Sequence, residues 1–178
     1  MTGRSHVLIG IASVVAACAE GWLAVSPFVL IGGVFGSLLP DIDTERSTLG
    51  HRCKWVARPI GRMFGHRGAT HSGLLLGLAV VCLVYFGGAA RLHGGWGALC
   101  LGYASHIVAD MPTGGVPLLY PVSKSRISLW PYARTGGIGE FLLLLCTLTG
   151  LFGLAWWSGH NVPIRQGSGI HIQCGLSF

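Results

Sequence analysis

Residues that could bind a metal ion stand where the apolar segments of this chain begin or end. They are four histidines and four acids: His6, His66, His71, His106, Asp41, Asp43, Asp110 and Glu140. If the apolar segments run up and down through a bilayer, all of these positions come to one side at one depth. Neutral imidazole and carboxylate together suit Zn²⁺, Mn²⁺ or Fe²⁺. The pattern therefore predicts a metal site at one membrane face.

His106 and Asp110 form the most compact pair, because they stand four residues apart in HIVAD. On a helix this spacing puts both side chains on one face, one turn apart, so a rigid element offers two ligands. A histidine and an aspartate at this spacing can also form a structural hydrogen bond. We expect both to be metal ligands because other candidate ligands stand at the same face.

Asp41 and Asp43 lie in LPDID, directly after an apolar segment. Two carboxylates so close together repel each other unless a positive group holds them. A metal ion would do this, and so would a nearby arginine such as Arg52 or Arg67. The sequence leaves open which of the two aspartates is the ligand. The other could cap a helix or accept a proton during catalysis.

The remaining candidates stand at the starts of apolar segments. His66 and His71 frame HRGATHS, His6 precedes the first segment, and Glu140 in TGGIGEF opens the last. Each histidine alone could be an ordinary interfacial residue. Glu140 could be a carboxylate that the positive end of a helix dipole favours. It could equally be a ligand or a general base beside the metal.

Composition places these segments in a membrane. Of 178 residues, 51% are hydrophobic and 10% are charged, whereas soluble domains carry about 25% charged residues. Five apolar segments occur at residues 6–25, 27–39, 72–90, 96–111 and 138–157. A spanning helix needs about 20 residues, so segment 27–39 is short enough to be tilted or only partly inserted. We predict an all-α, polytopic membrane bundle of these five helices over residues 1–158, followed by a polar tail at 159–178.

The distribution of positive charge predicts the orientation. The net charge is +6, and most Lys and Arg residues lie at 44–70 and 112–137, with Arg4 before the first segment. Because positive loops stay cytoplasmic, the N-terminus and the metal face are predicted to be cytoplasmic. Membrane lipid is therefore the expected partner. Nucleic acid is not, because the basic loops adjoin the membrane and carry few aromatic residues. The oligomeric state is left open.

Several motifs together resemble a known family. HRGATHS, LPDID, HIVAD followed by MPTGGVPLLYP, and TGGIGEF, with the early His6, resemble the YdjM-like family of predicted inner-membrane metal-dependent hydrolases over about residues 1–150. The order His, Asp, His, HxxxD, Glu is also similar to that of the zinc-dependent phospholipase C and P1 nuclease group, all-helical enzymes that cleave phosphoesters at a multi-zinc site. That group has a later HxxxE pair, whereas here Gly136 stands four residues before Glu140. The resemblance therefore implies one or two ions rather than three.

These observations predict a hydrolase of the bacterial inner membrane that uses a divalent metal, with Zn²⁺ expected first and Mn²⁺ or Fe²⁺ as alternatives. The metal makes bound water acidic enough to supply hydroxide, which attacks a phosphoester of a lipid or lipid-linked substrate. Glu140 or the spare aspartate, expected to be Asp43, accepts the proton. Arg52 and Arg67 hold the phosphate, since guanidinium matches it with two hydrogen bonds.

Two other classes of function remain open from the sequence. Histidines and acids at membrane depth also build ion or proton paths in transporters, but a transporter site lies near the midplane, and no internal repeat is visible. A metal-stabilised membrane protein without turnover would have a closed shell of ligands. The position and openness of the site therefore discriminate the three classes.

Overall fold

The structure is a computed structural model that describes residues 1–65 and 67–161. Within these ranges the chain is all helical and contains no strand, so the predicted all-α class is confirmed. Its α-helices are α1 (Gly3–Ala19), α2 (Pro27–Leu38), α3 (Thr48–Arg52), α4 (Lys54–Phe64), α5 (Gly73–Gly87), α6 (Gly95–Asp110) and α7 (Ile138–Asn161). Three short 3-10 helices connect them: η1 (Leu39–Asp43), η2 (Ala69–His71) and η3 (Ala89–His93).

Hydroxyl side chains fix where the apolar helices begin. Thr2 precedes α1, Ser26 precedes α2 and Ser72 precedes α5, and each side-chain oxygen accepts a hydrogen bond from a backbone N–H of the first turn. Such caps satisfy donors that a helix start otherwise leaves unpaired. These caps therefore fix the positions of two histidines relative to their helices. His6 lies close to the start of α1, and His71 lies directly before Ser72.

Glycines bring α2 and α6 into close contact. A Cβ atom added at Gly36 would lie 2.1 Å from the backbone oxygen of Leu99, and one at Gly102 would lie 2.2 Å from the backbone oxygen of Gly33. Helices without side chains at the crossing can approach this closely, as in many membrane proteins. The result matters for the site, because α2 leads directly into η1 and α6 carries His106 and Asp110.

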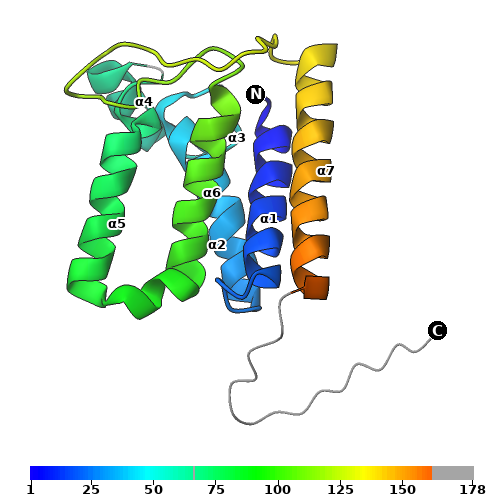
Figure 1. Ribbon diagram of the computed structural model, residues 1–178. Helices are drawn as coiled ribbons and strands as arrows, with labels where there is room; N and C mark the ends of the chain where they lie inside the picture. The colour runs from blue at the N-terminus through cyan, green and yellow to red at the C-terminus, as the bar shows by residue number, and fades with distance from the viewer. Residues whose placement is uncertain (66, 162–178) are drawn as a thin grey trace.

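Helices α1, α2, α6 and α7 lie side by side, with α5 to one side of them (Figure 1). The N-terminus, α3, α4 and the segment 111–137 gather at one end of this bundle. The C-terminal end of α6 and the N-terminal end of α7 lie at the same end. The fold therefore collects the segment ends that carry the candidate ligands, although they are distant in the sequence.

The prediction of five membrane spans is not confirmed. Among the described residues, one helix is long and apolar enough to cross a membrane, Ile138–Ser158 of α7. Helices α1, α2, α5 and α6 have 17, 12, 15 and 16 residues. At 1.5 Å per residue they extend roughly 18 to 26 Å, which is less than the roughly 30 Å of a bilayer core.

The physical reason is that the apolar segments are longer than the helices they form. The first segment turns at Gly21, where φ is +75°, and the third breaks at Gly88, where φ is +79°, before entering η3. Hydropathy counts the residues beyond these turns, whereas a spanning helix does not include them. Association with the membrane is supported differently, because α5 buries none of its side chains and exposes Leu78, Val81 and Phe86.

The predicted boundary between the domain and the tail, at residues 158 and 159, falls inside α7, which continues to Asn161. Residues 162–178 lie outside the described part of the chain, so the predicted polar tail stays a prediction.

Candidate metal centre

Oxygen atoms of two aspartates lie near the Nε2 atoms of two histidines at the end of the bundle. The Nε2 atoms of His71 and His106 are 3.3 Å apart. Oδ1 of Asp41 lies 3.9 and 3.8 Å from them, and Oδ2 of Asp110 lies 3.7 and 3.9 Å from them. Ligands at about 2.0–2.2 Å from a tetrahedral zinc ion are about 3.3–3.6 Å from one another. Most of these donor atoms are thus slightly farther apart than the ligands of a bound zinc ion. Little movement is needed for them to bind such an ion.

His6 on α1 lies beside this cluster. Its ring stacks on that of His106, with centroids 3.7 Å apart and an angle of 14° between the planes. Its Nε2 atom is 3.3 Å from Oδ1 of Asp110. The residue is 1% exposed, and neither ring nitrogen forms a hydrogen bond among the described residues. Buried polar atoms without a hydrogen bond are rare and costly, and a bound cation would satisfy one here.

The donor atoms fall into two overlapping groups. His6, His106 and Asp110 form one, and Asp41, His71 and His106 form the other, each with donor atoms within 4.8 Å of one another. His106 belongs to both groups. The arrangement is therefore compatible with one or two ions, and the predicted number of ions stays a prediction.

Hydrogen bonds behind the rings orient two of the histidines. Nδ1 of His106 donates to the backbone oxygen of Ser37 at 2.6 Å. Nδ1 of His71 lies 3.1 Å from the hydroxyl of Thr70 and 3.6 Å from Oδ2 of Asp43. When Nδ1 carries the proton, Nε2 offers its lone pair, which is the usual arrangement of a metal-binding histidine.

Asp43 takes a position different from that of Asp41. It is buried, and its Oδ2 atom accepts hydrogen bonds from the backbone N–H of Arg67 and the hydroxyl of Thr70, both at 2.8 Å. It thus lies behind His71, on the side away from His106. The geometry favours Asp41 as the ligand and Asp43 as a residue that positions His71, an alternative that the sequence left open.

Positive charge also reaches Asp110. Nη2 of Arg67 is 2.8 Å from Oδ2, and the amino group of Met1 is 2.5 Å from Oδ1. The guanidinium passes over Gly114, where a Cβ atom would lie 2.2 Å from Nη1 of Arg67. Arg67 itself has a φ of +59°, which is uncommon for a residue with a side chain. These contacts compensate the negative charge of the buried Asp110 carboxylate. A metal ion would share this carboxylate with Arg67 and the Met1 amino group.

Asp41 marks the open side of the cluster. Its side chain is 18% exposed, whereas those of His71, His106 and Asp110 are at most 2% exposed. Burial raises the pKa of the Asp41 carboxyl, and the nearby His6 and His71 act in the opposite direction. Solvent therefore reaches the cluster on the side of Asp41.

Glu140 ties the first and last helices together. Its Oε1 atom accepts from the backbone N–H of Thr2 at 2.7 Å and from the hydroxyl of Ser5 at 2.6 Å. Its Oε2 atom accepts from the backbone N–H of Gly136 at 2.7 Å. Since both carboxylate oxygens are engaged, the structure favours a capping and positioning role over a general base. Glu140 then acts on the site indirectly, because Ser5 precedes His6.

The other predicted residues are placed as follows. Arg52 ends α3 and is exposed. His66 lies outside the described residues, so its predicted role as a ligand stays a prediction. Sequence reasoning did not identify Ser37 and Thr70, which orient the histidines. Thr70 directly precedes His71, which is a usable signal, whereas Ser37 contributes a backbone oxygen that any residue would supply.

The position of the cluster bears on the choice between enzyme and transporter. Its members come from the start of α1, from η1 and η2, and from the last turn of α6, all at one end of the bundle (Figure 1). A transporter site would lie near the middle of its helices. The cluster thus lies at one end of the helices rather than near their middle.

Comparison with known proteins shows the family of this chain. The model of the YdjM inner membrane protein family matches residues 1–165. The inner membrane protein YdjM of Escherichia coli is 35% identical over 92% of this chain and 85% of the relative. The uncharacterized protein YvsG of Bacillus subtilis is 33% identical over 81% and 88%, and the inner membrane protein YbcI of E. coli is 30% identical over 77% and 88%. No solved structure matches. The chain belongs to the YdjM inner membrane protein family.

Proposed function

We propose that this member of the YdjM inner membrane protein family is a metal-dependent hydrolase that cleaves a phosphoester of a lipid or lipid-linked substrate at the cytoplasmic face of the inner membrane. The observation that carries the proposal is the meeting of five imidazole and carboxylate side chains from four separate elements. One of them, His6, has both ring nitrogens buried without a hydrogen bond among the described residues, and a bound cation would satisfy one of these nitrogens.

The donor set fits a divalent metal, with Zn²⁺ expected before Mn²⁺ or Fe²⁺, because it combines neutral imidazole with carboxylate and uses no thiolate. When bound, such an ion acts as a Lewis acid and lowers the pKa of bound water far enough to supply hydroxide near neutral pH. His6, His71, His106 and Asp110 would hold it on the buried side. Asp41 would complete the set at the open side.

Arg67 is the group best placed to bind the substrate phosphate. Its guanidinium already lies 2.8 Å from Asp110 and is held over Gly114, so it is oriented before any substrate arrives. A planar guanidinium matches two phosphate oxygens at once. We assign Arg52, exposed at the same end of the bundle, a secondary part in attracting the anionic headgroup.

The proton-accepting role falls to Oδ2 of Asp41 in this proposal, while Oδ1, which faces His71 and His106, would hold the metal. The sequence suggested Glu140 or Asp43, but the oxygens of Glu140 are engaged by Thr2, Ser5 and Gly136, and Asp43 lies behind His71. Asp41 combines partial exposure with a position at the cluster.

The first experiment measures metal in the full-length protein purified in detergent. We expect metal to copurify with the wild type and to be lost from the His106→Ala/Asp110→Ala double variant. The matched control is His51→Ala/Glu45→Ala, since both residues are exposed on the helices and turns outside the cluster. Equal metal content in the wild type and the His106/Asp110 variant refutes the metal centre.

The second experiment tests hydrolysis. The metal-loaded protein is incubated with vesicles that contain phosphatidic acid, phosphatidylglycerol or a polyprenyl phosphate ester, and released phosphate and alcohol are measured. We expect release with at least one lipid phosphoester by the wild type and none by the double variant. Release that persists in the double variant would assign the activity elsewhere.

A non-catalytic, metal-stabilised protein is the second candidate, and one observation favours it. Asp110 is already neutralised by Arg67 and by the Met1 amino group, so the cluster could be stable without substrate chemistry. The spectrum of the Co²⁺-substituted protein tests this candidate. A closed coordination shell without an exchangeable water ligand would decide in its favour.

A further inference from the structure

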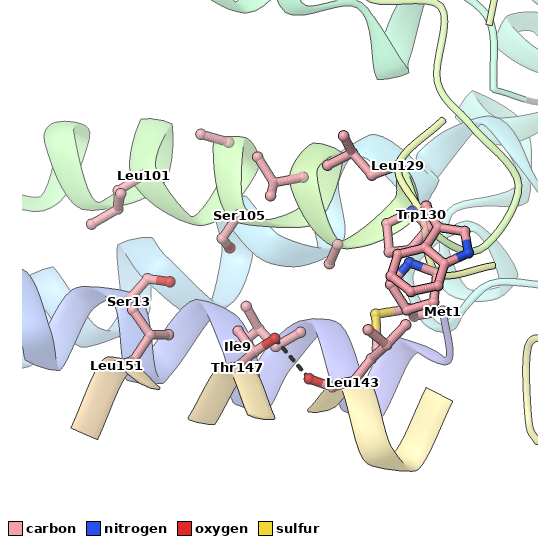
Figure 2. A pocket seen from close by; sticks show the side chains of 15 residues that line it. Met1, Ile9, Ser13, Leu101, Ser105, Leu129, Trp130, Leu143, Thr147 and Leu151 are labelled. Atoms are coloured by element: carbon pink, nitrogen blue, oxygen red, sulfur yellow. Dashed lines mark hydrogen bonds between the residues drawn. The ribbon is translucent and has the colours of Figure 1, made fainter. Parts of the chain in front are cut away.

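An apolar groove runs beside the metal centre, between α1, α6 and α7. Its volume is about 460 Å³, within the range of small-molecule sites. Figure 2 shows its side chains projecting from the three helices, with Met1 and Trp130 at one end and Leu151 toward the other. The lining residues recur every four positions: Ile9 and Ser13 on α1, Leu101 and Ser105 on α6, and Leu143, Thr147 and Leu151 on α7. Each helix therefore turns one continuous face to the groove.

The chemistry of the lining fits an aliphatic chain rather than a polar ligand. The hydroxyl of Ser105 donates to the backbone oxygen of Gly102, and that of Thr147 donates to the backbone oxygen of Leu143 (Figure 2). Both hydroxyls are thus used within their own helices. The rest of the lining is almost entirely apolar. A ligand here gains from the removal of apolar surface from water or lipid and has few polar partners to satisfy.

The surroundings of the groove indicate a lipid as its occupant. One wall is α7, the helix that can span a membrane, and that helix is almost entirely exposed in its spanning window. The groove therefore faces the bilayer. At its end near the cluster, Trp130 is 87% exposed in the segment that also exposes Lys124, Arg126 and Arg134. Exposed Trp with Lys and Arg is the combination found at headgroup level, where it attracts anionic lipids.

The groove also joins the metal centre. Met1 lines its end, and the amino group of the same residue contacts Asp110. Ala109, directly before Asp110, and Pro112, two residues after it, line that end as well. Asp110 and the groove thus occupy neighbouring faces of the last turn of α6. A molecule whose chain lies in the groove presents its head to the end of the bundle that carries the cluster, beside Met1.

We infer that the groove binds one acyl chain of an anionic membrane phospholipid and holds its phosphate end toward the metal centre. The inference rests on the proposed function for its meaning, because it makes the substrate a lipid with a long aliphatic chain rather than a soluble phosphoester. Binding of the chain itself can be measured independently of hydrolysis.

The test uses the full-length protein in nanodiscs of phosphatidylcholine and phosphatidylglycerol, with a phosphatidylglycerol probe that carries a diazirine midway along one acyl chain. After irradiation, mass spectrometry of peptides locates the labelled residues. Ser105→Phe fills the groove from α6, and Thr147→Phe fills it from α7. The matched control is Val81→Phe on α5, where the side chain points away from the bundle. Metal content is measured in every variant.

We expect labelling of groove residues in the wild type and in Val81→Phe. Because each filling variant displaces several methylene groups, we expect labelling there to fall by about tenfold or more. Metal content should stay at the wild-type level, which shows that the variants are folded. Labelling spread evenly over the outer faces of α5 and α7, labelling that persists in both filling variants, or crosslinks to a second copy of the chain overturns the inference.

The outcomes for the groove and for the proposed function are separable. Bound metal without groove labelling overturns the acyl-chain site and leaves the hydrolase proposal intact. Groove labelling in a protein that binds no metal supports the lipid site and refutes the hydrolase.

Discussion

Asp43→Asn tests how the centre is built. Its carboxylate lies 3.6 Å from Nδ1 of His71 and accepts hydrogen bonds from Arg67 and Thr70. Asparagine has the same shape but no charge and only one accepting oxygen. We therefore expect His71 to lose orientation and basicity while it remains a ligand. Loss of such an outer partner typically weakens metal affinity by about 10- to 100-fold, which corresponds to about 1.4–2.7 kcal/mol.

The assay is competition for Zn²⁺ against a chromophoric chelator, with the full-length protein in detergent. Glu45→Gln is the matched control, since it removes an acid two positions away whose side chain is 43% exposed and paired with Arg58. Exposed pairs contribute at most about 1 kcal/mol to stability, so the control should keep the wild-type affinity.

Two results would refute the reasoning about Asp43. Unchanged affinity means that Asp43 does not orient His71. Complete loss of metal, as expected for His106→Ala, means that Asp43 is a direct ligand and that the assignment of Asp41 is incorrect. Thermal unfolding of the metal-free variant shows whether the protein is still folded, and so distinguishes both results from loss of the fold.

Three further perturbations test the packing, the helix tie and the phosphate group. Gly36→Ala should lower the free energy of unfolding by about 1–3 kcal/mol, because its Cβ atom meets the backbone of α6. The control Gly77→Ala has open space around the added Cβ atom and should not be destabilising. Thermal unfolding in detergent compares the two variants. Glu140→Gln should lower the free energy of unfolding by about 1–3 kcal/mol, because it weakens hydrogen bonds to a charged carboxylate, and the folded protein should still hydrolyse substrate. A large loss of turnover at an unchanged free energy of unfolding would instead identify Glu140 as a general base. Arg67→Lys should raise KM for a lipid phosphoester while metal content is unchanged, because Lys cannot form two parallel hydrogen bonds to the phosphate. The control is Arg62→Lys, on the exposed face of α4. An equal KM in both variants contradicts the role of Arg67 in binding phosphate.

The sequence predicted much of the fold for local reasons. Hydroxyl residues before apolar runs, as at Thr2 and Ser72, place the helix starts near the predicted positions. The four-residue spacing of His106 and Asp110 puts them on one helical face whatever the rest of the chain does. The predicted five membrane spans are not confirmed, because turns at Gly21 and Gly88, which hydropathy does not register, make the helices shorter than the apolar segments.

The roles within the site depended on contacts that no local pattern carries. Asp41 and Asp43 are two residues apart and chemically identical, and only the position of His71 on η2 places Asp41 among the candidate ligands and Asp43 behind the ring. Glu140 looked like a possible base until Thr2 and Ser5 were found at its oxygens. The apolar groove is likewise invisible in the sequence, because each helix contributes residues that would serve equally well in a packed core.

By itself, the sequence determined that the protein is helical, that it belongs with a membrane, and that its imidazoles and carboxylates stand at the ends of apolar segments. These follow from spacing and composition, whose effects act within a few residues along the chain. Only the tertiary structure decided which of those side chains face a common point, which lie behind them, and where an acyl chain could lie. Such choices depend on the distances between elements, and these are set by close glycine packing and by hydrogen bonds that join residues as many as 138 positions apart.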